Sequence, residues 1–175
     1  MTKKQNRVTA AELIARLQAD PEWVRDHEEK EAKRKLFEAQ LDAEERPLIA
    51  ELAEVGILVT CVYDLVNART SYPAAISVLA RHLLLPYHTR IREGIARALT
   101  VKEARGTAAR VVLDELKWLT QPDEKGEFRW TLANALTVIG DKTMEDEIKM
   151  LIADDRYQDV HERLQEALKK RCAAE

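Results

Sequence analysis

Histidines and carboxylates are the residues of this chain that could bind a metal or transfer a proton. His82 and His88 are separated by five residues that include Pro86, and no nearby cysteine or carboxylate pair completes a set of metal ligands. His27 begins the sequence His-Glu-Glu-Lys-Glu, which lacks the second histidine of a zinc-protease helix. No nucleophile–base arrangement or glycine-rich phosphate loop is evident. We therefore expect polar contacts from the histidines, and no metal, cofactor or catalytic site.

Arginines are the second group of residues that could carry a function. Residues 69–117 contain nine lysines and arginines and four acidic residues, a net charge of +5, whereas the whole chain has a net charge of −3. Arg90, Arg92 and Arg97 are clustered within this segment. The cluster could form a solvated helix face with salt bridges between helices, a surface for an acidic protein partner, or a nucleic-acid site. Nucleic acid is the least favoured, because the acidic remainder of the chain would be repelled by a duplex.

These arginines lie in a sequence that occurs twice. Residues 90–101 read RIREGIARALTV, and residues 127–138 read EFRWTLANALTV. This alignment pairs Arg92 with Arg129 and Arg97 with Asn134. The candidate binding residues are therefore Arg90, Arg92, Arg97, Arg129 and Asn134.

A third, weaker copy follows toward the C-terminus. It has His161 where the first two copies have an arginine, and it aligns Leu168 with Leu99 and Leu136. We expect these three leucines to be equivalent core positions.

The repeated segments have the periodicity of amphipathic helices. Before the first copy, Ile76, Leu79, Ala80 and Leu83 follow the spacing i, i+3, i+4, i+7. A single helix pair cannot bury its apolar stripe alone, whereas stacked pairs form a continuous core, which explains why the pattern recurs. Few glycines and prolines and many alanines, leucines and charged residues also favour helix. We predict an all-α fold with more than 65% helix and no sheet of three or more strands.

The N-terminal part of the chain is predicted to be a charged helical extension. Thr9 and Glu12 form a predicted capping box, and Asp20 precedes Pro21 as the predicted N-cap of a long helix. We expect that helix to stop at Pro47 and a short helix after it to end at Gly56. The predicted domains are a disordered tail (1–8), the helical extension (9–68) and a repeat domain (69–175).

The sequence from Ile57 to Asn67, ILVTCVYDLVN, is the one stretch with strand-like character. We expect an extended entry and then a helical turn with Thr60 as its N-cap. Cys61 and Cys172 are far apart in sequence and suit free thiols in a reducing compartment. With no apolar signal segment and no run of about 18 apolar residues, a soluble cytoplasmic protein is expected.

Residues 74–99, AAISVLARHLLLPYHTRIREGIARAL, resemble a HEAT-type repeat of the short kind first recognised in phycobilin lyases. The likeness consists of an apolar first helix, a loop, and a second helix reading apolar-Arg-x-x-apolar-Ala-x-Ala-Leu, and it covers about residues 73–171. The whole chain also resembles uncharacterised bacterial HEAT-containing proteins. The resemblance implies a short α-solenoid of about three helix pairs, whose second helices line a concave face.

HEAT proteins are mostly binding scaffolds, but some are cofactor-attaching lyases and some are DNA glycosylases that use an acid and aromatic residues in a basic groove. Asp64, Tyr63, Trp118 and Trp130 are residues of those types. We favour the alternative, in which the two tryptophans pack between repeats.

Two functions therefore remain. The first is a non-enzymatic protein–protein interaction module (a scaffold, an inhibitor or an immunity-type binding protein) whose partner has an acidic surface. The alternative is a HEAT-like enzyme or nucleic-acid-handling protein that uses the basic segment 69–117. Convergence of the arginines and Asp64 in one groove beside an exposed tryptophan would favour the second, whereas burial of Trp118 and Trp130 between repeats would favour the first.

Overall fold

The computed structural model describes residues 9–121 and 127–172, and within these ranges every regular element is a helix. Helix makes up 77% of the described residues, which confirms the all-α prediction. The chain divides between Leu41 and Asp42 into two compact units. The predicted domain boundary at 68/69 therefore falls inside the second unit, and the predicted tail 1–8 lies outside the described residues.

The first unit contains α1 (Ala10–Gln18) and the beginning of α2 (Pro21–Glu54). The capping box before α1 is present: the Glu12 amide donates to Thr9 Oγ1 and the Thr9 amide donates to the Glu12 carboxylate. Asp20 caps α2 by accepting a hydrogen bond from the Glu22 amide at 3.0 Å. No helix in the described ranges is long and apolar enough to cross a membrane.

Helix α2 does not stop at Pro47, contrary to our prediction. Proline lacks an amide hydrogen and removes one backbone bond, but the helix continues because Leu48 and Leu52 beyond it are fully buried in the second unit. The helix ends as predicted at Gly56, which has a φ of +82°. There the Ile57 amide donates to the Leu52 carbonyl at 2.9 Å, the long-range bond of a Schellman ending.

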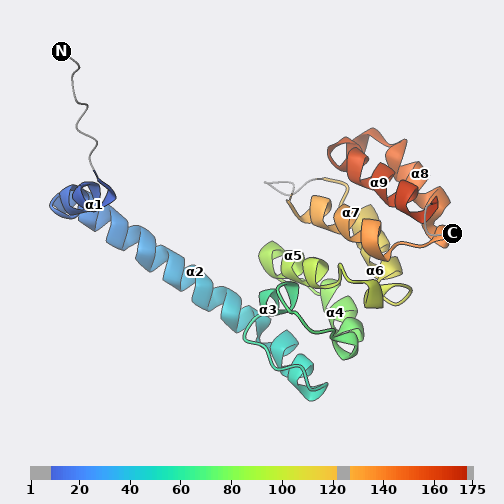
Figure 1. Cartoon of the computed structure of the whole chain (residues 1–175), viewed down its shortest axis with the longest axis horizontal. Helices are drawn as coiled ribbons and strands as arrows, with labels where there is room; N and C mark the ends of the chain where they lie inside the picture. The colour runs from blue at the N-terminus through green and yellow to red at the C-terminus, as the bar shows by residue number, and fades with distance from the viewer. Residues whose placement is uncertain (1–8, 122–126, 173–175) are drawn as a thin grey trace, which may run out of the picture. The chain divides into compact units, whose positions relative to one another are not determined.

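Three helix pairs follow one another in the second unit, from green to red in Figure 1. Each second helix contacts the next, α5 with α7 and α7 with α9, and the first helices α4 and α6 also touch. The short α3, which precedes the first pair in the chain, also contacts α5. The pairs are α4 (Ile76–Leu83) with α5 (Thr89–Ala98), α6 (Ala109–Trp118) with α7 (Glu127–Ile139), and α8 (Glu145–Ile152) with α9 (His161–Cys172); α3 is Tyr63–Val66.

Short 3₁₀ helices connect or open these pairs. They are η1 (Pro73–Ala75), η2 (Lys102–Ala104), η3 (Lys142–Met144) and η4 (Asp155–Val160). Tyr72, which directly precedes η1, donates its hydroxyl to the Ala98 carbonyl at the end of α5 at 2.9 Å.

The three predicted core leucines are not equivalent. Leu99 and Leu136 are fully buried at the ends of α5 and α7, whereas Leu168 in α9 is only half-buried. The difference arises because each of the first two is followed by another helix pair, and no helix of the described chain follows α9.

The strand-like sequence forms no sheet. Residues 57–59 run without helical turns, as expected, and a turn leads into α3. The N-cap of α3 is Val62 and not Thr60. Thr60 instead donates from its amide and its hydroxyl to the Asp64 carboxylate, each at 2.8 Å, so the side chain within the helix holds the turn before it.

Candidate functional site

The five candidate binding residues divide into two groups. Arg92 and Arg129 lie in the interior, whereas Arg90 and Arg97 are exposed and Asn134 is half-buried. The predicted cluster is thus not a single patch, and the two groups have different structural roles.

Arg92 connects α5 to three other parts of the fold. Its Nε and Nη2 donate to the Leu83 carbonyl at the end of α4, at 3.2 and 3.1 Å. Nη2 also pairs with Glu115 in α6, and the guanidinium lies 4.9 Å from the ring centroid of Phe128 in α7. With 19% of its side chain exposed, Arg92 has its donors directed into the protein.

Arg129, its partner in the sequence repeat, makes the corresponding connection one pair later. The side chain is 0% exposed and pairs with Asp159 at 3.0 Å. Nη2 donates to the Arg156 carbonyl at 2.5 Å, and the guanidinium lies 4.7 Å from the ring centroid of Tyr157. Each repeated arginine therefore ties its helix to the pair that follows it.

The exposed group lies along the second helices. Helix α7 is buried on all sides except for one stripe, which carries Trp130 and Asn134 four residues apart. Trp130 is 38% exposed, and Arg163 of α9 lies over its ring at 5.4 Å. Arg97 in α5 occupies the position equivalent to Asn134. We call Arg90, Arg97, Trp130, Asn134 and Arg163 the second-helix surface.

Contrary to our prediction, the two tryptophans do not pack between repeats. Trp118 is 82% exposed at the end of α6, and Trp130 is on the open stripe of α7. Periodicity alone could have found the second: Phe128, Leu132 and Ala135 mark the buried side of α7, and Trp130 falls on the opposite side with Asn134.

Most positive charge in the basic segment is neutralised within the fold. Arg81 pairs with Glu51, and Arg97 pairs with Glu93 at 2.8 Å from its Nε. Arg110 and Lys117 both bind Glu147 of α8. Hydrogen bonds from these two cations lower the pKa of Glu147 to about 2. The net charge of +5 in the sequence of residues 69–117 therefore overstates how basic the surface of this segment is.

The histidines serve local polar contacts. His82 is buried, with Nδ1 2.8 Å from the Tyr87 hydroxyl and Nε2 3.1 Å from a Glu51 oxygen. His88 caps α5 by accepting from the Arg90 amide at 3.1 Å. Within the described residues, no group of three or more histidine, cysteine or acidic side chains could hold a metal ion.

Asp64 has a structural task. It accepts from the amide and hydroxyl of Thr60 and from the Cys61 amide, and these hydrogen bonds lower its pKa. Its neighbour Tyr63 donates its hydroxyl to the Arg90 carbonyl at 3.1 Å. Asp64 and Tyr63, the acid and one of the aromatics expected of a glycosylase-type site, thus hold α3 and its turn against α5, whereas Trp118 and Trp130 are exposed.

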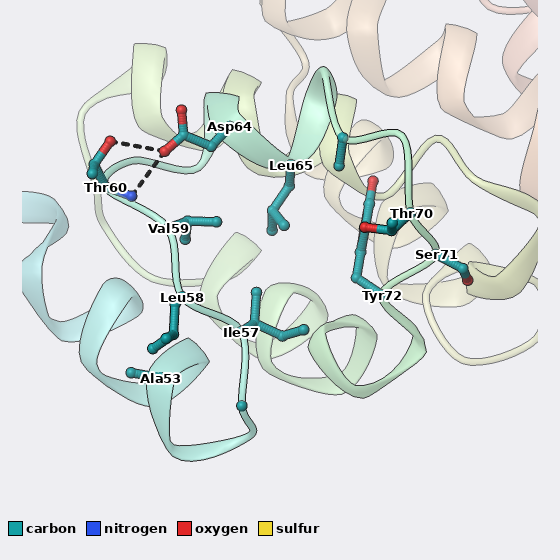
Figure 2. Close-up of a pocket in the computed structure, with 12 residues that line it drawn as sticks. Ala53, Ile57, Leu58, Val59, Thr60, Asp64, Leu65, Thr70, Ser71 and Tyr72 are labelled. Atoms are coloured by element: carbon teal, nitrogen blue, oxygen red, sulfur yellow. Dashed lines mark hydrogen bonds between the residues drawn. The ribbon is translucent and has the colours of Figure 1, made fainter.

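A groove of 690 Å³ is the other surface feature of the second unit. One wall is the non-helical run 57–60, and the other is the segment 68–72 (Figure 2). The side chains of Ile57, Val59 and Leu65 point into the space between the walls, and Tyr72 stands on the far side. The groove shares no residue with the second-helix surface.

Comparison of the chain with family models, with curated proteins and with solved structures gives no match.

Proposed function

We propose that this protein is a non-enzymatic protein-binding module, a short α-solenoid of HEAT-like helix pairs that contacts a protein partner through the second-helix surface. The observation that carries the proposal is the open stripe of α7. A helix that is otherwise buried presents a partly exposed tryptophan there, next to an arginine from α9.

The solenoid part of the proposal is supported by the repeated arginines. Arg92 and Arg129 occupy equivalent positions, and each makes an ion pair, a hydrogen bond to a carbonyl and a contact with an aromatic ring. In both cases the carboxylate of the ion pair and the aromatic ring belong to the next helix pair. A contact that recurs with the sequence repeat is what stacking of similar units requires.

A protein is the partner that best fits the chemistry of this surface. Tryptophan and arginine are the residues most often found at the energetic centres of protein interfaces. Two of the three arginines there are accompanied by carboxylates, Glu93 beside Arg97 and Glu166 beside Arg163. A nucleic-acid surface would need unpaired positive charge along a phosphate backbone. The paired charges therefore favour a protein over the enzyme or nucleic-acid alternative.

The experiment is site-specific photocrosslinking in the source cell. A photoreactive amino acid replaces Asn134 on the second-helix surface or, as a control, Met150, which is exposed on α8 of the first-helix side. We expect one protein to be crosslinked from position 134 and not from 150, and the purified protein to bind the wild-type chain saturably. Equal crosslinking from both positions, crosslinking to nucleic acid alone, or no crosslinked product would overturn the proposal.

A further inference from the structure

Both walls of the groove leave main-chain hydrogen-bonding groups unused. Among the described residues, the amides and carbonyls of Leu58 and Val59 have no hydrogen-bond partner. The same holds on the opposite wall for the amides and carbonyls of Arg69, Thr70 and Ser71. In an otherwise helical protein these two short segments are places where another chain could add main-chain bonds.

The floor between the walls is apolar. Leu65 is buried at its base, Tyr72 is buried on the far side, and Ile57 and Val59 are half-buried along the near side. Leu58 projects from the same wall with 85% of its surface exposed. The volume of 690 Å³ is in the range of sites that accept ligands of a few residues, about 300–1,000 Å³.

The groove continues past the second wall. A smaller hollow of 360 Å³ shares Leu65, Thr70, Ser71 and Tyr72 with it, and reaches Ile76 and Glu103. Its lining includes the hydroxyl side chains of Thr70, Ser71 and Tyr72 beside the charged Arg69 and Glu103, and Ser71 Oγ donates to Glu103 at 2.7 Å. The site therefore has length, an apolar floor and polar edges.

We propose that this groove binds an extended peptide segment of another protein, which pairs its main chain with residues 58–59 or 69–71 and places alternate apolar side chains on the floor. Free main-chain groups beside apolar pockets are the features by which proteins recognise a peptide in strand conformation. An amphipathic helix is a poorer occupant because its main-chain groups are already paired. The site is separate from the second-helix surface, so the two proposals fail or succeed independently.

The test uses a phage-displayed library of random peptides, selected on the full-length chain. Clones that bind the wild type are compared on Thr70→Trp, which fills the groove from an exposed position, and on Thr107→Trp, at another exposed threonine outside it. We expect enriched peptides to have apolar residues at every second position. They should bind Thr70→Trp at least about tenfold more weakly than the wild type or Thr107→Trp, a difference of about 1.4 kcal/mol.

A chemical control tests the main-chain pairing directly. The best peptide is resynthesised with alternate amides N-methylated, which removes its donors and preserves its side chains, and we expect at least tenfold loss of affinity for one of the two methylation registers. No enrichment, apolar spacing of three to four residues, equal binding to Thr70→Trp, or full affinity of both methylated peptides would overturn the proposal.

Discussion

Gly94 of α5 lies against Val62 and Tyr63 at the beginning of α3, with no room for a side chain. A Cβ atom at this position would lie 2.5 Å from Val62 Cγ1 and 2.9 Å from Tyr63 Cε2. We expect Gly94→Ala to lower the free energy of unfolding by about 1–3 kcal/mol, because either α3 must move or side chains must leave their preferred rotamers. Urea unfolding measures the change.

A double mutant separates this collision from other effects. Val62→Ala removes the nearest methyl group, so Gly94→Ala should cost less in that background than in the wild type. Additive costs would show that the contact between α3 and α5 is not as close as described.

Glu147 couples stability to pH. Its pKa is lowered from an ordinary value near 4.5 to about 2 by Arg110 and Lys117, so its carboxylate stabilises the folded state above the unfolded pKa. That contribution is lost as pH falls from about 4.5 toward 2. We expect Glu147→Gln to be less stable than the wild type near pH 6, and the difference to shrink near pH 3.

The measurement is urea unfolding of both proteins across this pH range. Glu162→Gln, at an exposed position on α9, provides the control because it removes one carboxylate without breaking these bonds. A difference between wild type and Glu147→Gln that does not change with pH would contradict the assigned pairing.

At the scale of elements, the repeated arginines join successive helix pairs. Arg92→Ala would leave Glu115 without its partner in a largely buried position, so we expect a loss of about 3–5 kcal/mol in the free energy of unfolding. Arg34→Ala also removes an arginine that binds two carboxylates, but these are exposed, and its cost should be much smaller. Similar unfolding midpoints for the two variants would show that Arg92 is not a structural tie.

The core leucines test the stacking of the pairs. Leu99→Ala and Leu136→Ala remove fully buried side chains, and each should cost about 2–5 kcal/mol. Leu168→Ala should cost less than either, because Leu168 is half-buried. Chemical denaturation gives the three values, and an equal cost at Leu168 would mean that α9 is covered more completely than we describe.

The helices and their order were predictable because apolar spacing, capping residues and Gly56 act locally. The end of the helix was wrongly predicted at Pro47 because helix propensity does not include the burial of side chains. Leu48 and Leu52 follow Pro47 closely in sequence, but they are packed by distant residues. The exposure of Trp130 was missed because we applied the apolar periodicity to α7 as a whole. Applied to each side of the helix, the same periodicity places Trp130 opposite the buried residues. The groove was not predictable, because its walls are 57–60 and 68–72, segments without regular structure.

At the scale of the whole molecule, many charged side chains form ion pairs and do not build an extended surface of one sign. The basic excess of residues 69–117 is partly balanced by carboxylates from α2 and α8, namely Glu51 and Glu147. What distinguishes the surface is therefore the placement of a few side chains and not net charge. The proposed interaction with a partner would therefore rest on local contacts, and ionic strength should affect the rate of association more than its specificity.

The most direct measurement of the central claim is a binding titration of the crosslinked partner with two tryptophan variants. Trp130→Ala alters the second-helix surface, whereas Trp118→Ala removes a more exposed tryptophan from α6. With thermal melting checked for both, we predict that Trp130→Ala weakens binding at least about thirtyfold, as for an interface centre worth about 2 kcal/mol, and that Trp118→Ala changes it less than about twofold. Unchanged affinity for Trp130→Ala, or a larger loss for Trp118→Ala, would contradict the proposed binding surface.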